Sequence, residues 1–121
     1  MAKITKISSV YLDGQRLPAK EAKLKFGGSK REAVKGMADG EILGHTASET
    51  AAPSLEVTLA HTDDMSVADY QAIEDATLTC VTSGGKTYVL GEAYCVETGE
   101  LSNGDVSVTF EALRFTEQKG A

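Results

Sequence analysis

The chain has 121 residues, of which 41% are apolar and 25% are charged, and its formal net charge is −6. This length suits one domain, and we expect residues 1–121 to form it. No run of about 20 apolar residues is present, so we expect no membrane span. The N-terminal residues also lack the apolar segment of a signal peptide. Two cysteines, Cys80 and Cys95, are too few for a disulfide scaffold and lack metal-motif spacing, so we expect reduced thiols.

Charge is divided unevenly along the chain. Residues 1–35 carry nine basic and three acidic side chains, a net charge of +6, whereas residues 36–121 carry three basic and fifteen acidic ones, a net charge of −12. Surfaces of opposite sign would favour head-to-tail association of identical copies, although chance clustering on a solvated surface gives the same pattern. The acidic total, the lack of Trp and the 6% aromatic content argue against stable nucleic-acid binding. An acidic wall would instead let a polyanion pass without adhering.

The segment Gly27–Pro53 does not fit a compact domain, because it holds five of the twelve glycines and shows no amphipathic period. A connection this long is uncommon unless it has a function or is disordered. We expect an extended hairpin with strands near 29–35 and 41–46 and a tip near 38–40; a flexible loop is the alternative. Its large apolar side chains would then project beyond the body and need another chain to cover them: Val34, Met37, Ile42 and Leu43.

The remaining sequence is typical of antiparallel strands. Apolar and polar residues alternate through Ser54–His61 and Asp105–Phe115, as expected of strands with one face on a core. Ala76–Thr82 and Lys86–Leu90 are rich in β-branched and aromatic residues, which favour strands. Three dipeptides suit tight hairpin turns because their residues adopt positive φ readily: Asp13-Gly14, Gly84-Gly85 and Asn103-Gly104.

One helix is predicted from about Ser66 to Glu74. Ser66 is a good N-cap, and Asp69 three residues later favours the positive end of the helix dipole. Met65 and Tyr70 stand where a hydrophobic staple would form. The helix is too short to stand alone, so we expect it to lie against the sheets and cover one end of them.

Catalytic patterns are sparse. His61 with Asp63 and Asp64 could form a metal site or a general base, but this run is more simply a solvated turn that leads into the helix cap. No serine lies in a nucleophile elbow, and no glycine cluster follows the phosphate-binding pattern. Cys80 is in phase with Leu78 and is expected in the core; burial is also favoured for Cys95. We therefore expect no enzyme activity, no metal and no cofactor.

Three runs carry a family resemblance that extends over about Thr5–Glu117. LPAKEAKLKFGGSKREAVKG (Leu17–Gly36) resembles the segment of Mu-like phage tail tube proteins in which a strand and a Gly-Gly turn lead into a basic arm. TDDMSVADYQAIEDATLTC (Thr62–Cys80) is similar to that family's helix and following strand. KTYVLGEAYCVETGELSNGDVSVTFEA (Lys86–Ala112) is similar to its closing strands.

The resemblance implies a mainly β fold of two packed antiparallel sheets, a β-sandwich or distorted barrel, with one short α-helix and a long projecting hairpin. It implies a structural subunit of the inner tube of a contractile phage tail or phage-like particle. Six copies would form a ring, and stacked rings would enclose a lumen for DNA passage without specific binding. The expected partners are further copies of the chain, the tail sheath, and baseplate or tail-terminator proteins, with no membrane. The subunit would belong to the virion and be assembled in the host cytoplasm.

Two groups of residues are candidates for this role. We expect seven residues of the projecting arm to contact other subunits: Lys30, Arg31, Val34, Met37, Glu41, Ile42 and Leu43. Seven residues on the polar phase of long strands are candidates to face the lumen: Glu56, Thr58, Thr77, Thr79, Ser107, Thr109 and Glu111. The alternative function is a small β-barrel module that binds a ligand or peptide, which would explain the strands but not the long glycine-rich arm.

Overall fold

The computed structural model describes residues 4–63 and 65–118, and over these it is almost entirely antiparallel β. Seven strands form one sheet in the order β2-β1-β7-β8-β9-β6-β3, and two strands, β4 and β5, form a separate hairpin. No helix of this described part is long and apolar enough to cross a membrane. The elements in chain order are β1 (Ile7–Leu12), β2 (Gln15–Arg16), β3 (Ala19–Lys25), β4 (Gly28–Lys35), β5 (Ile42–Ala51), β6 (Ser54–Ala60), α1 (Val67–Gln71), β7 (Ala76–Thr82), β8 (Thr87–Ser102) and β9 (Asp105–Gln118).

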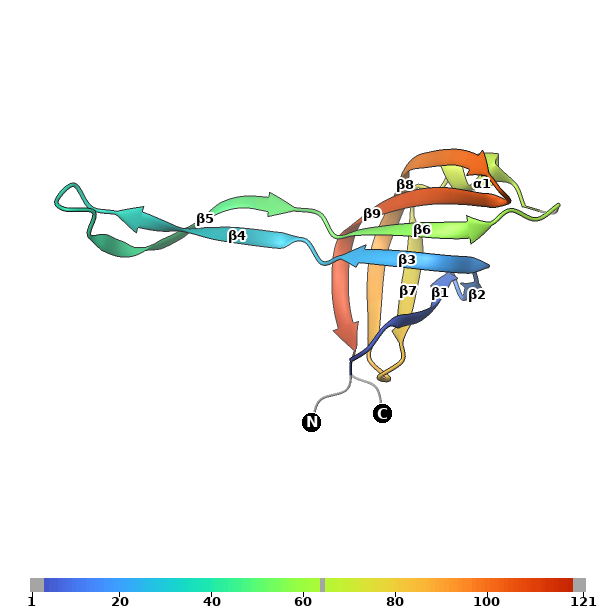
Figure 1. Ribbon diagram of the computed structural model, residues 1–121, viewed down its shortest axis with the longest axis horizontal. Coiled ribbons are helices and arrows are strands. Elements are labelled where there is room, and N and C mark those ends of the chain that lie inside the picture. The colour runs from blue at the N-terminus through green and yellow to red at the C-terminus, as the bar shows by residue number, and fades with distance from the viewer. Residues whose placement is uncertain (1–3, 64, 119–121) are drawn as a thin grey trace.

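The seven-stranded sheet curls on itself into a distorted barrel, and β4 and β5 extend from it as a long arm (Figure 1). Strands β8 and β9 are long enough to belong to both walls: β7 pairs with the first half of β8, whereas β6 pairs with the first half of β9. Register shifts in the β8–β9 pairing accompany the bend. The mainly β architecture with one helix and a projecting hairpin is confirmed. The two walls of the body, however, are halves of one continuous sheet, and the second sheet is the arm.

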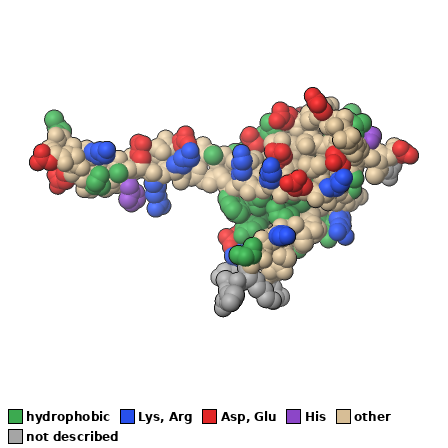
Figure 2. Space-filling view, in the orientation of Figure 1, with side chains coloured by type: hydrophobic (Ala, Val, Ile, Leu, Met, Phe, Trp, Pro, Cys, Tyr) green, Lys and Arg blue, Asp and Glu red, His purple; other side chains and the backbone are tan. Residues whose placement is uncertain are grey.

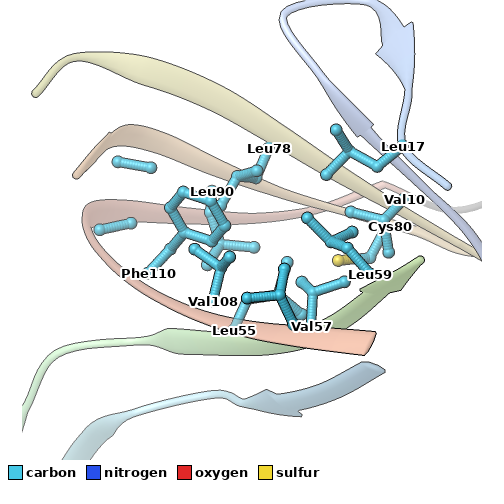
Figure 3. Close-up of a cluster of buried hydrophobic side chains, with 13 residues drawn as sticks. Val10, Leu17, Leu55, Val57, Leu59, Leu78, Cys80, Leu90, Val108 and Phe110 are labelled. Atoms are coloured by element: carbon cyan, nitrogen blue, oxygen red, sulfur yellow. The ribbon is translucent and has the colours of Figure 1, made fainter. Parts of the chain in front are cut away.

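The core lies inside this curl and follows the predicted alternation. Leu55, Val57 and Leu59 of β6 are fully buried, as are Val108 and Phe110 of β9. Their side chains meet Leu78 and Cys80 of β7 and Leu90 of β8 between the two walls (Figure 3). The apolar phase of each strand therefore faces the same interior, which fixes the register, because a slip by one residue would expose it.

Two of the three predicted turns have the expected geometry at both positions. Asp13 and Gly14 have φ of 49° and 86°, and Asn103 and Gly104 have φ of 55° and 78°. These values are typical of the two-residue turns whose twist matches that of the flanking strands. The third, Gly84-Gly85, has positive φ only at Gly85 (90°).

The helix starts as predicted but is shorter. The Ser66 side chain accepts a hydrogen bond from the Asp69 N–H (3.3 Å), which confirms the N-cap. The predicted end at Glu74 is wrong, since α1 ends at Gln71. The reason is the sheet: the Ile73 carbonyl accepts from the Cys95 N–H of β8 (3.0 Å) and so leaves the helical pattern.

Candidate assembly surfaces

The arm is the part of the molecule that deviates most from a compact domain. Strands β4 and β5 pair only with each other, and every residue in both is exposed. The tip is closed by two short backbone bonds, from the Gly36 N–H to the Glu41 carbonyl (2.6 Å) and from the Glu41 N–H to the Ala38 carbonyl (3.1 Å). The segment therefore forms a regular β-hairpin whose strands bury no side chains.

Apolar side chains of the arm face solvent. Met37 at the tip is fully exposed, at 107% of its reference area, and the other three predicted apolar contact residues are exposed as well: Val34, Ile42 and Leu43. Four large apolar groups on so thin a projection have no partner surface within one chain. Exposed apolar groups that cluster in this way are typical of protein–protein contact surfaces.

The two faces of the arm carry different charges. Neighbouring residues of a strand point to opposite faces, and cross-strand partners share a face. Arg31 pairs with Ala47 and Lys35 pairs with Ile42, so both cations lie on one face, where no carboxylate is paired beside them. On the other face Lys30 forms an ion pair with Glu49 (2.8 Å). One face of the arm is thus cationic and partly apolar, whereas the other carries Lys30 with two carboxylates, Glu32 and Glu49.

Basic residues continue from the arm into the body. Lys20, Lys23 and Lys25 are exposed on β3, which leads directly into β4. Figure 2 shows blue and red side chains interspersed along the arm, blue ones at its junction with the body, and red ones over the upper body and at the two far ends. Residues 28–51 carry three basic and four acidic side chains, so the basic surface is confined to β3 and one face of the arm.

An aromatic cluster at the root of the arm was missed by sequence reasoning. The Phe26 ring lies 5.2 Å from that of Tyr88 and 5.5 Å from that of Phe115 between centroids. Phe26 is nevertheless 54% exposed. Gly27 beside it has φ of 74°, and a Cβ there would lie 2.6 Å from the Ala51 carbonyl oxygen. Three rings from distant strands and one tight glycine thus hold the arm where it leaves the body.

Five of the seven candidate lumen residues form one polar surface on the outside of the β6–β9 pair. Glu56 lies opposite Thr109, and Thr58 lies opposite Ser107. The Glu111 carboxylate accepts a hydrogen bond from the Tyr94 hydroxyl (3.2 Å), and partial desolvation together with this bond raises the pKa of Tyr94. The other two, Thr77 and Thr79, lie on β7, which β8 separates from β9. The structure therefore brings five candidates together and places two on the other wall.

The residues considered for catalysis do not form a site within the described part of the chain. His61 and Asp63 are exposed in a loop, and Asp64 lies outside the described residues. No group of three potential metal-ligating side chains occurs among the residues that the structure describes. Cys80 is fully buried, as predicted, and burial raises the pKa of its thiol to about 11. Cys95 is only partly buried, and burial raises its pKa as well.

Two comparisons with known protein sequences identify the family of this chain. The family model described as phage tail tube protein matches residues 1–117. The tail tube protein of the Mu-like prophage FluMu from Haemophilus influenzae (strain ATCC 51907 / DSM 11121 / KW20 / Rd) is 34% identical over 94 residues, which cover 77% of this chain and 76% of that protein. The family match covers both the arm and the body.

Solved structures share the fold at low sequence identity. The sheath/tube terminator of the extracellular contractile injection system PVC has a TM-score of 0.72 at 12% identity and covers 91% of each chain. A chain of the PVC sheath-tube complex has a TM-score of 0.68 at 10% identity and covers 92% of this chain and 87% of its own. The tube-terminating cap of the anti-feeding prophage has a TM-score of 0.73 at 14% identity, with 99% and 95% covered. With the family match and the prophage relative, this agreement leads to one conclusion: the chain belongs to the phage tail tube protein family.

Proposed function

We propose that this tail tube protein builds the inner tube of a contractile tail by forming hexameric rings that stack around a lumen. The observation that carries the proposal is the arm, whose two strands contain 8 and 10 residues and bury none of them. An isolated two-stranded hairpin is marginally stable in water. Neighbouring copies that cover the hairpin would supply the stabilising contacts that it lacks within one chain.

Unpaired strand edges support the same proposal. Within residues 4–63 and 65–118, strand β3 pairs only with β6 and β2 pairs only with β1, so both outer strands of the curled sheet present unpaired backbone groups. Such edges are templates for pairing with another chain. Edge-to-edge association of copies would satisfy them within a ring and would turn six open sheets into one closed wall.

The partners of such a tube follow from its place in the particle. The PVC relatives occur in assemblies described as sheath-tube and sheath/tube terminator complexes. We infer that this chain likewise contacts sheath, baseplate and tail-terminator proteins in the virion tail, after assembly in the host cytoplasm. The tube needs no catalytic residue, cofactor or metal for this role.

Passage of DNA requires a wall that does not bind it. The contiguous polar surface of β6 and β9 carries Glu56 and Glu111 and is the best candidate for the lumen. Carboxylates there repel phosphates, so a polyanion slides without adhering. Thr77 and Thr79 on the other wall would face the lumen only if β7 also lines it.

The proposal is tested by shortening the arm. Replacing Ala33–His45 with Asn-Gly joins the cross-strand pair Glu32 and Thr46 through a two-residue turn and keeps the Lys30–Glu49 ion pair. We expect a folded body with unchanged thermal unfolding that forms no tubes in negative-stain electron micrographs, whereas the full chain forms them. Tubes of normal appearance from the shortened chain would refute the role of the arm, and rings with another subunit number would refute the hexamer.

The lumen assignment is tested by charge reversal. In phage particles the double variant Glu56→Lys/Glu111→Lys should leave tubes intact and reduce DNA delivery. The control Glu92→Lys/Glu117→Lys makes an equal change in net charge at exposed positions away from β6. It also removes the ion pairs with Arg114 and Lys86, so tube formation is checked for both double variants. Equal delivery by the two double variants would remove the support for an acidic lumen on this face.

A further inference from the structure

An open groove of about 680 Å³ lies at the end of the body that is farthest from the arm. Strand β3 leads into β4, and β5 leads into β6, so the arm leaves the body at one end of the β3–β6 pair. Pro18 precedes β3 and Thr62 follows β6, and both line the groove. The arm and the groove are therefore fixed at opposite ends of the same two strands (Figure 1).

The floor of the groove is apolar. It is formed by side chains from β1, from the loop before α1, and from α1 and the residues that follow it: Leu12, Met65, Tyr70 and Ile73. All four are only partly buried while packing against the core. Burial raises the pKa of Tyr70, which is consistent with an environment from which water is partly excluded. An apolar surface is thus open to solvent at this end.

Acidic residues outnumber basic ones in the segments that line the groove, in which Arg16 between Gln15 and Pro18 is the one cation. Asp69 lines the groove, and Asp63, Glu74 and Asp75 are exposed on the residues that flank α1. The sequence contains no Lys or Arg between Lys35 and Lys86, so the segment that carries α1 has no cation of its own. A partner for this surface needs apolar side chains for the floor and cations for the rim.

The arm of the same chain has both features. Lys35 and its cross-strand partner Ile42 share one face, together with Arg31. Within the described residues neither Arg31 nor Lys35 has an ion-pair partner, in contrast to Lys30. Met37 and Ile42 are exposed beside this cationic face. The tip turn also carries two exposed carboxylates, Asp39 and Glu41, so only this face of the arm, and not the tip as a whole, complements an acidic rim. The complement of the groove therefore lies at the opposite end of the molecule.

We propose that the groove beside α1 receives the outer half of the arm of a second copy, with Met37 and Ile42 against its floor and Lys35 beside Asp69. This deepens the proposed function and rests on it, since it names where one ring holds the next. A chain cannot satisfy its own groove, because β3 and β6 separate the two ends. At about 3.3 Å per residue, the eight residues of β4 span about 26 Å, roughly the length of the body strand β3. The arm is therefore about as long as the body strand that separates its root from the groove.

Photo-crosslinking tests the location directly. The variant Met37→p-benzoylphenylalanine would be assembled from an equal mixture of ¹⁴N- and ¹⁵N-labelled chains, and the tubes irradiated and analysed by peptide mass spectrometry. We expect mixed-isotope adducts with residues 12–18 or 65–73 and no adducts in unassembled chains. Adducts elsewhere, or none in intact tubes, overturn the proposal. The variant Ser83→p-benzoylphenylalanine, at an exposed turn of the other wall, is the control that should not label the groove.

A charge exchange tests the pairing. Lys35→Glu and Asp69→Lys should each raise the concentration needed for assembly by about tenfold, because each places like charges together. The double variant Lys35→Glu/Asp69→Lys should restore assembly, whereas Lys35→Glu/Glu100→Lys should not. Failure of the double variant to restore assembly contradicts the Lys35–Asp69 pairing.

These experiments separate the inference from the proposed function. If the full chain forms no tubes, the proposed function itself fails. If tubes form but Met37 labels another surface, stacking stands and only the groove is excluded.

Discussion

The arm and the body are built from the same kind of strand, yet they are held in opposite ways. In β6 of the body, alternate side chains are fully buried, and the hydrophobic effect fixes the register. In β4 and β5 no side chain is buried, so backbone pairing, the tip turn and exposed polar contacts such as the Lys30–Glu49 ion pair define the hairpin. The comparison shows that strand structure here does not require a core. It also assigns the two regions different roles, since the body supplies folding stability and the arm supplies surface for other chains.

Removing one large side chain from each region tests this difference in stability most directly. Phe110→Ala should destabilise the body by about 3–5 kcal/mol, because Phe110 is fully buried and its loss leaves a cavity. Met37→Ser, at a fully exposed position, should change the free energy of unfolding by less than about 0.5 kcal/mol. Urea denaturation followed by circular dichroism measures both. A large loss in Met37→Ser would show that the arm contributes to folding.

The junction between the regions is probed at its two glycines. Gly27→Ala should destabilise the arm root by about 2 kcal/mol, since the added Cβ meets the Ala51 carbonyl oxygen at 2.6 Å in a positive-φ conformation. Gly28→Ala is the matched control, with φ of 95° but open space around the Cβ. Faster tryptic cleavage of the arm in Gly27→Ala than in Gly28→Ala would show the effect of the clash. Equal rates would show that only the backbone conformation matters.

The ionisation and reactivity of the Cys80 thiol test whether this side chain is buried in the body core. Its pKa is raised from 9.0 to about 11 by burial, so the unfolded chain loses this proton first as pH rises. The free energy of unfolding should therefore fall between pH 9 and pH 11, with Cys80 contributing at most about 3 kcal/mol. The difference between the natural chain and Cys80→Val isolates this contribution. Reaction with Ellman's reagent at pH 8 should reach Cys80 only after unfolding, and rapid labelling of the native protein would contradict its burial.

The smallest effect concerns the helix that covers the end of the body. Ser66→Ala removes the side-chain acceptor for the Asp69 N–H and should cost about 1 kcal/mol. Ser83→Ala, in a turn of the other wall, serves as the control, although its side chain also accepts a backbone hydrogen bond, from Lys6. Thermal unfolding measures both. A cost in Ser66→Ala no greater than in the control would show that packing of α1, rather than its cap, determines its stability.

Much of the body could be predicted because its signals are local. Alternation predicted β6 and β9, β-branched residues predicted β7, and Asn103-Gly104 predicted the turn between β8 and β9. The extent of β8 could not be predicted, because Gly91, Glu92 and Gly99 interrupt its pattern where the strand bends. The residues alone do not show how the strands join into one curled sheet, since pairings such as β1 with β7 join segments about 70 residues apart and leave no local signature. The expectation of a distorted barrel came from the family resemblance.

The candidate surfaces were predictable to a different degree. The arm was predictable because the segment is too long for a compact loop and contains four large apolar residues. The exposure of these residues is confirmed, and their contacts with other subunits stay a prediction. The aromatic cluster was not predictable, because Phe26, Tyr88 and Phe115 meet only through the fold. The exposure of Leu113 was predictable, because Leu113 occupies a position of β9 that alternation assigns to the polar face.

Because no side chain of β4 or β5 is buried, substitutions in the arm leave the folding of the subunit almost untouched. Selection on the arm therefore acts through its fit to neighbouring subunits. Selection on the body acts through the packing that its own folding requires. Subunits of two lineages that differ in the arm alone would fold in the same way. They would nevertheless fail to assemble into one tube in a co-infected host. The arm is the place where such incompatibility between related particles would arise first.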